Sequence, residues 1–113
     1  MKAREIYLAH FPFGDVPGMK LRPVLVLTGT LGSVPEVLVA YISSVIPAHV
    51  LPTDLLIDPA HPEFRSTRLK APSVVRLHKL ATLHCSSLVR RLGQLESSQY
   101  TLVLANIRTL LGL

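Results

Sequence analysis

The stretch Lys20-Leu21-Arg22-Pro23-Val24-Leu25-Val26-Leu27 decides the fold, because it predicts a strand of apolar residues with one arginine, Arg22, directly before it. Proline has no backbone N–H, so Pro23 fits best as the first strand residue and favours an extended Arg22 just outside the sheet. The apolar run that follows is typical of a core strand. Arg22 then offers five N–H donors on a stiff stem, which suits a phosphate. An ordinary surface arginine beside a strand is the alternative interpretation.

Further short strands are predicted on both sides of this stretch, which itself forms a strand over Pro23–Thr28. Alternating or continuous apolar residues bounded by Gly, Pro and Ser indicate them. The only long helix begins at Ser97 or Ser98 and continues to Gly112, with apolar residues at helical spacing. The other predicted strands are Glu5–Phe11, Glu36–Ser43, Thr53–Ile57, Ser73–Leu77 and Leu80–Leu83, and a single helical turn is predicted over Leu88–Leu92.

Many short strands before one C-terminal helix predict a mainly β fold, a small and strongly bent antiparallel barrel with the helix packed against it. An OB-like barrel is the nearest rival architecture. The 113 residues suit one domain, residues 1–113. A hydrophobic content of 49% is high for so short a chain and favours a homodimer that covers apolar surface. No apolar run reaches the roughly 18 to 20 residues of a membrane span, and no signal segment is visible, so we expect a cytoplasmic protein.

The charge balance predicts an anionic partner, either nucleic acid or an acidic protein segment. Twelve Lys and Arg residues against seven Asp and Glu give a net charge of +5. Between Glu63 and Glu96 the chain has no acidic residue, so this tract suits phosphates, although a solvated basic face is the alternative. The single Cys85 excludes an intramolecular disulfide and a usual zinc cage. The basic residues of the tract are Arg65, Arg68, Lys70, Arg76, Lys79, Arg90 and Arg91.

A series of motifs in fixed order carries a family resemblance. The chain resembles the MazF/PemK (Kid) family of toxins from type II toxin–antitoxin systems, nearly end to end. Each motif alone is weak, and their common order makes the match specific. The motifs are Ile6-Tyr7-Leu8, Phe11-Pro12-Phe13, Arg22-Pro23-Val24-Leu25-Val26, Val39-Ala40-Tyr41-Ile42-Ser43-Ser44, Ser73-Val74-Val75-Arg76-Leu77, Arg91-Leu92-Gly93 and Leu111-Gly112-Leu113.

This resemblance implies an SH3-like barrel of the CcdB/PemK type with a C-terminal helix, a homodimer, and an endoribonuclease that cuts single-stranded RNA without metal or other cofactor. It also implies a cognate antitoxin whose acidic, disordered tail covers the active-site groove. Carried over by residue, Arg22 matches the family's catalytic arginine and Ser43 the threonine that ends the third strand. Ser44 matches the small polar residue after it, and Arg76 the arginine that some members use as a general acid.

The sequence departs from the family pattern at the residue expected to move a proton. His78 stands where some members have an aspartate, and Ser43 replaces a threonine. Histidine exchanges protons near neutral pH, so His78 is a candidate acid or base beside Arg76, with a half-buried structural histidine as the alternative. The general base therefore stays open. For RNA binding, Phe13 is predicted to stack on a base, and Lys20, Ser44, Lys70 and Lys79 are predicted to contact the strand.

Two other functions stay open on the sequence alone. The first is a CcdB-like inhibitor of a protein target, although the end Leu110-Leu111-Gly112-Leu113 lacks the aromatic tip of that branch. The second is a catalytically silent barrel that binds RNA, which would apply if His78 and Ser43 are losses of function.

Overall fold

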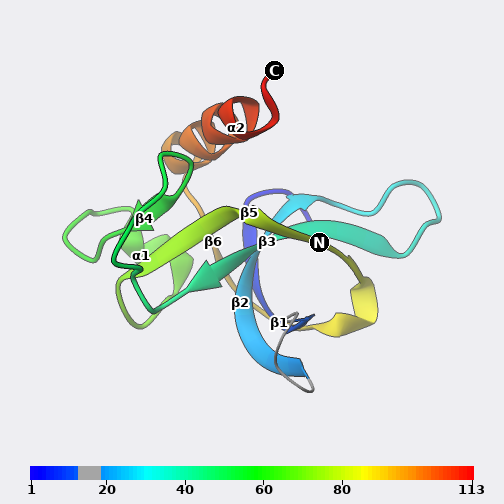
Figure 1. Cartoon of the computed structure of the whole chain (residues 1–113). Helices are drawn as coiled ribbons and strands as arrows, with labels where there is room; N and C mark the ends of the chain where they lie inside the picture. The colour runs from blue at the N-terminus through cyan, green and yellow to red at the C-terminus, as the bar shows by residue number, and fades with distance from the viewer. Residues whose placement is uncertain (13–18) are drawn as a thin grey trace.

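The structure, a computed structural model, describes residues 1–12 and 19–113, so the predicted base-stacking Phe13 lies outside the described residues. Six strands form one antiparallel sheet in the order β4-β5-β3-β2-β1-β6, and α2 lies beyond one end of it (Figure 1). The described elements are β1 (Glu5–Pro12), β2 (Met19–Thr28), β3 (Glu36–Ser43), β4 (Leu55–Ile57), α1 (Phe64–Thr67), β5 (Ser73–His84), a 3₁₀ turn η1 (Cys85–Ser87), β6 (Leu88–Gln94) and α2 (Ser97–Leu111).

The predicted fold class is confirmed, because the chain is mainly β and antiparallel and ends in a helix. The strand pairing does not close into a complete barrel, since β4 and β6 form the two edges of the sheet. The sheet instead bends at irregular places in its ladders, where a strand carries more residues than its partner.

Two hydrophobic cores lie on the two sides of the sheet, as the period of two along a strand requires. Leu25 and Ile42 belong to the first core, which also includes Val103 of α2. Val24 and Tyr41 belong to the second, which also includes Phe11 of β1. Neighbouring residues of one strand therefore serve opposite sides, and this alternation decides where each candidate site residue points.

The strand β2 begins earlier than the sequence predicts. Arg22 lies inside the strand opposite Ala9, and not just outside the sheet, while Pro23 lies opposite Leu8. The ladder between β2 and β3 starts only at Val24. On that side Pro23 is therefore at an open edge, where a residue without an N–H costs the ladder no hydrogen bond.

The two predicted strand pieces at residues 73–77 and 80–83 form one strand, β5, with an irregularity between them. Tyr41 pairs with Arg76, and the adjacent Ala40 pairs with Leu80, so three residues of β5 bulge at this point. The bulge contains His78 and Lys79. It bends β5 and lifts these two side chains out of the regular ladder.

The predicted helical turn over residues 88–92 is wrong, because this segment is the edge strand β6 and pairs with β1. The helical turn comes earlier, at η1, where the His84 side chain accepts a hydrogen bond from the Ser86 N–H. The short helix α1, which the sequence did not predict, packs against β6. A Cβ at Gly93 would lie 2.2 Å from the carbonyl oxygen of Ser66, so only glycine permits this approach.

The helix α2 is capped at both ends. Its N-cap is Glu96 and not Ser97 or Ser98, and Glu96 forms a capping box with Gln99. At the other end Gly112 adopts a φ of 72°, the left-handed conformation typical of a glycine C-cap. Among the described residues, no helix is both long and apolar enough to cross a membrane.

Candidate functional site

The candidate catalytic residues lie around Tyr41 on one side of the sheet. Tyr41 pairs with Val24 of β2 on one flank and with Arg76 of β5 on the other. Directly opposed residues of an antiparallel pair share a face, so Arg76 lies on the side of Tyr41. Arg22 and Ser43 each lie two residues from the Val24–Tyr41 pair, so the period of two gives them the same face. We call this surface the Tyr41 face.

Arg76 is held in place by a buried carboxylate. Its Nε donates to Oδ1 of Asp54 at 3.1 Å, and the other carboxylate oxygen accepts the backbone N–H of Leu51 at 2.8 Å. The side chain of Asp54 is 0% exposed and that of Arg76 is 16% exposed. The ion pair therefore fixes the guanidinium through its Nε, and the other N–H groups of Arg76 can act on a ligand.

His78 adjoins this ion pair at the bulge of β5. Val75 and Leu77 both belong to the first core, so Arg76 and His78 point away from that core, and His78 is exposed. Desolvation, together with the positive charges of Arg76 and Lys79, lowers the pKa of His78 below 6.5, while Asp54 opposes the shift. The imidazole is therefore mostly neutral at pH 7 and can accept a proton.

The Ser43 hydroxyl forms a turn at the end of β3. It accepts the N–H of Val45 and contacts the Val45 carbonyl oxygen as a donor, both at 3.1 Å. These bonds are ordinary strand-end chemistry and fix the position of the hydroxyl next to the Tyr41 face. Arg22 is half-buried on the same face. Its backbone is therefore held within the sheet and not just outside it, and its role as a phosphate ligand stays a prediction.

Two of the predicted RNA-binding lysines border the same face. Lys20 pairs with Phe11 and is exposed, two residues before Arg22. The amine of Lys79 lies 5.5 Å from the centre of the Tyr41 ring, and the rings of Phe11 and Tyr41 are 5.2 Å apart. A cation above an aromatic ring is attracted by the electrons of its face. Positive charge therefore surrounds the aromatic pair.

The structure separates the other two predicted RNA-binding residues from this group. Ser44 follows Ser43 and thus points to the opposite side, where it lines a slot together with Lys70. The slot adjoins a hollow of about 560 Å³, which Lys70 also lines. The predicted site residues therefore divide into two groups on the two sides of one end of the sheet.

Asp54 is a functional candidate that the sequence did not predict. A lone aspartate before a short strand has no distinguishing pattern, and its partner Arg76 is 22 residues away. The only signal in the sequence is that acidic residues are few, seven in the whole chain, so each of them is worth testing as a partner for an arginine. Within residues 1–12 and 19–113, no three His, Cys, Asp or Glu side chains gather in a way that could hold a metal ion.

Comparison with solved structures gives close matches over the whole fold. The Mycobacterium tuberculosis toxin MazF-mt6 is 28% identical, with a TM-score of 0.76 and coverage of 97% of this chain and 98% of that one. A chain titled a crystal structure of an Mtb toxin is 27% identical, with a TM-score of 0.66 and coverage of 94% and 98%. An endoribonuclease in complex with its cognate antitoxin, from Mycobacterial species, shares the fold at 16% identity and a TM-score of 0.74, with coverage of 100% and 96%.

Sequence comparison leads to the same relationship. No curated protein matches the chain. The family model of the PemK-like, MazF-like toxins matches residues 2–111, which is nearly the whole sequence. The chain therefore belongs to the PemK-like, MazF-like toxin family of type II toxin–antitoxin systems.

Proposed function

We propose that this toxin is a metal-independent endoribonuclease that cleaves single-stranded RNA by attack of a ribose 2′-hydroxyl on the adjacent phosphate. The observation that carries the proposal is the Tyr41 face, where Arg22, Ser43 and Arg76 come together from three neighbouring strands. The solved structure titled an endoribonuclease from Mycobacterial species shares the fold at 16% identity and is consistent with it.

The two arginines supply the positive charge that the reaction requires. In the transition state, negative charge accumulates on the oxygens of a five-coordinate phosphorus. Arg76 is already fixed by Asp54, so its guanidinium needs little reorganisation to stabilise that charge. Arg76 contacts one non-bridging oxygen of the phosphate, and Arg22, on β2, contacts the other. The Ser43 hydroxyl orients the phosphate between the two arginines. A guanidinium keeps its proton at ordinary pH, so Arg76 acts here as a charge and not as a general acid.

His78 is the proposed general base. Its lowered pKa keeps the imidazole neutral at pH 7, so it can remove the proton from the 2′-hydroxyl. The 2′-oxygen then bonds to phosphorus while the bond from phosphorus to the 5′-oxygen breaks. The imidazolium returns its proton to the leaving 5′-oxygen directly or through water. The products are a 2′,3′-cyclic phosphate and a 5′-hydroxyl, and His78 ends neutral.

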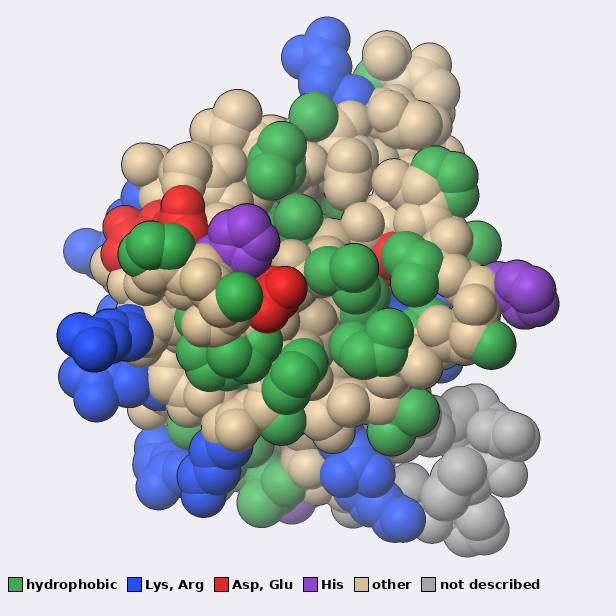
Figure 2. All heavy atoms as spheres, turned by 90° about the vertical axis from the view of Figure 1, so that its left-hand side faces the viewer, with side chains coloured by type: hydrophobic (Ala, Val, Ile, Leu, Met, Phe, Trp, Pro, Cys, Tyr) green, Lys and Arg blue, Asp and Glu red, His purple; other side chains and the backbone are tan. Residues whose placement is uncertain are grey.

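The proposal includes two protein partners and a cytoplasmic site of action. The first partner is a cognate antitoxin with an acidic, disordered tail, which complements the net charge of +5. The second is another copy of the chain. Apolar side chains gather on the face that carries β4 (Figure 2), and Leu56 of that strand is 52% exposed. Exposed apolar patches commonly mark protein interfaces. Light scattering should give a mass twice the 12.4 kDa of one chain.

The direct test is cleavage of a labelled single-stranded RNA by the purified protein in the presence of EDTA. We expect cleavage with 2′,3′-cyclic phosphate ends. Arg22→Ala should lose roughly 10²- to 10³-fold in rate, because it removes one preorganised donor. Arg108→Ala, which removes an exposed arginine of α2, is the matched control and should retain the rate. Circular dichroism checks that both variants fold.

Two outcomes would contradict the proposal in different ways. Cleavage that disappears with EDTA would contradict the metal-independent mechanism while leaving a nuclease. Binding of RNA without any cleavage would identify a silent RNA-binding member of the family.

A further inference from the structure

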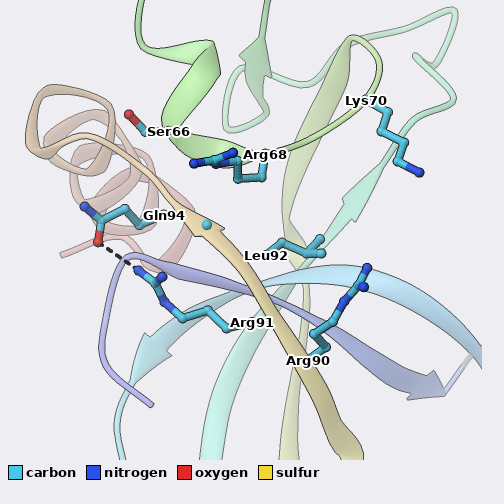
Figure 3. A pocket seen from close by; sticks show the side chains of 8 residues that line it. Ser66, Arg68, Lys70, Arg90, Arg91, Leu92 and Gln94 are labelled. Atoms are coloured by element: carbon cyan, nitrogen blue, oxygen red, sulfur yellow. Dashed lines mark hydrogen bonds between the residues drawn. The ribbon is translucent and has the colours of Figure 1, made fainter.

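A second cationic site lies between β6 and the segment that joins α1 to β5. Arg68 and Lys70 come from that segment, and Arg90 and Arg91 come from β6. They surround the hollow of about 560 Å³, whose lining among residues 1–12 and 19–113 includes no acidic side chain. Figure 3 shows the side chain of Arg90 extending upward from β6 on the side where Lys70 lies, while the guanidinium of Arg68 is turned toward Ser66. We call this site the basic hollow.

Among the residues that the structure describes, three of the four cations have no carboxylate partner. Arg91 is committed to the protein, because its guanidinium bonds Glu5 at 2.8 Å and Gln94 at 3.3 Å. For Arg68, Lys70 and Arg90, no ion pair is formed with any carboxylate that the structure describes. Like charges around one space repel each other, so an anion placed between them is stabilised. The charges around the basic hollow therefore favour an anionic ligand.

The backbone of Arg68 supports a role for its side chain. This residue ends α1 with a φ of 58°, in the left-handed region that glycine adopts without a steric penalty. An arginine at such a position disfavours the fold relative to glycine. A strained residue at a site is a reason to infer function there. Arg4 has a similar backbone with a φ of 78° and lines neither the hollow nor the slot, so Arg68 is distinguished by its place in the hollow and not by its backbone alone.

An apolar slot of about 360 Å³ continues from the basic hollow and shares Arg68, Lys70 and Arg90 with it. Half of the residues that line the slot are apolar, and Ser44 and the buried Ser73 also line it. A flat, weakly polar group fits such a slot, while an attached anion fits the cations beside it. The apolar wall residues are Leu8, Pro23, Leu69, Ala71 and Leu92.

The slot lies directly behind the Tyr41 face. Pro23 and Ser44 line the slot, and the residues before them, Arg22 and Ser43, point to the other side of the sheet. Because Pro23 and Ser44 directly follow Arg22 and Ser43 in the chain, the slot and the Tyr41 face meet at this end of β2 and β3. An RNA strand carries a phosphate at every nucleotide and so can occupy both cationic sites at once.

We propose that the basic hollow and its slot form a nucleotide subsite for the same single-stranded RNA, with a base in the slot and a phosphate against Arg68, Lys70 and Arg90. This inference rests on the proposed function. It assigns binding, and not chemistry, to these three residues. The apolar slot favours RNA over an acidic peptide such as the antitoxin tail, because the peptide would match the charges but carries no base for the slot.

The test measures binding of a fluorescent single-stranded RNA with all 2′-hydroxyls methylated, which cannot be cleaved by 2′-oxygen attack. Arg68→Gly suits the left-handed backbone and should fold, and Arg90→Gln is a second variant. We expect each to weaken binding roughly tenfold and to reduce the slope of log K against log salt by about 0.7. Arg65→Gln, an exposed change on α1 outside the hollow, is the matched control. On cleavable RNA the two variants should raise KM with little change in kcat.

The outcomes separate this inference from the proposed function. If the wild-type protein binds the methylated RNA but never cleaves ordinary RNA, and both variants weaken binding, the subsite stands and the proposed function fails. Cleavage by the wild-type protein with unchanged affinity and salt slope in both variants would overturn the subsite alone. An acidic peptide that loses affinity in both variants while RNA does not would show a peptide site and overturn the inference. Absence of RNA binding by the wild-type protein would overturn both.

Discussion

The Tyr41 face and the basic hollow both use arginine, but they hold it in different ways. On the Tyr41 face, Arg76 lies within a strand and is fixed by a fully buried carboxylate. In the hollow, Arg68 and Arg90 come from a short connecting segment and an edge strand, and both are exposed. A fixed guanidinium can stabilise a transition state without reorganising, whereas an exposed one adapts to a bound strand.

This difference predicts that substitutions on the two sides of the sheet change different quantities. Changes on the Tyr41 face should lower the rate of cleavage, and changes in the hollow should lower the affinity for RNA. A variant on either side that lowered the cleavage rate and the RNA affinity to the same extent would contradict this division of roles between the two sites.

The largest effect is expected from His78→Gln, which removes the proposed base. Loss of a general base costs roughly 10²- to 10⁴-fold in rate. Because desolvation and the nearby cations lower the pKa of His78, the wild-type rate should fall only as the pH drops below 6.5. The pH profile of kcat/KM measures this fall on the acid side, which we call the acid limb, and the His78→Gln variant should not show it.

His49→Gln, which changes an exposed histidine in the loop after β3, is the control and should keep both the rate and the limb. Wild-type activity that rises as the pH falls through this range would mean that the imidazolium is required, and the role of base would be wrong.

The next effect is expected from Asp54→Ala, which leaves Arg76 without its buried partner. Removing one member of a buried ion pair costs about 3 to 5 kcal/mol. Urea denaturation should show this loss of stability, and cleavage by the remaining folded protein should fall because Arg76 is no longer fixed. Glu36→Ala removes an exposed carboxylate of β3 and is the control. A loss below about 1 kcal/mol, the range of a surface pair, would show that Asp54 does not anchor the Tyr41 face.

Much of the Tyr41 face could be predicted because its residues belong to strongly patterned strands. The apolar runs beside Arg22 and before Ser43 identify β2 and β3, and the period of two then gives each side chain its face. What the sequence does not give is the pairing that brings Asp54 to Arg76. That contact depends on β4 lying beside β5, which no local pattern records.

The basic hollow was less predictable, although its charges were visible as a tract. The segment Leu88–Leu92 has a helix-compatible spacing and follows two serines, so local sequence favours a helical turn. Pairing with β1 overrides that preference and makes it an edge strand. Only then do Arg90 and Lys70 border one hollow. The missed helix α1 has four residues, too short for any periodic signal.

Gly93→Ala tests the close packing on which the hollow depends. The added Cβ would meet the carbonyl oxygen of Ser66 at 2.2 Å, so α1 and β6 must separate. Overpacking of this kind costs typically about 1 to 3 kcal/mol, measurable by urea denaturation, and RNA affinity should fall with the displaced Arg68. Gly32→Ala has open space around it and changes only a left-handed turn, so the stability lost there should be smaller and RNA affinity unchanged. Equal losses of stability and affinity in the two variants would contradict the packing argument.

The smallest effect is expected from Glu5→Gln, which tests whether Arg91 differs from the other cations of the hollow. Burial raises the pKa of Glu5, but the hydrogen bond from the Lys2 N–H and the ion pair with Arg91 outweigh it, so the pKa lies below 4.5. A carboxyl with a lowered pKa stabilises the fold above 4.5, and this contribution is lost as the pH falls through the folded-state pKa. Because Arg91 is 46% exposed, Glu5→Gln should cost only about 0.2 to 1 kcal/mol at pH 7 and less in acid.

The double variant with Arg91→Gln should destabilise by less than the sum of the single changes, because each alone already breaks the pair. If the losses of stability of the two single variants add exactly in the double variant, Arg91 does not interact with Glu5 and is available to RNA like Arg68 and Arg90.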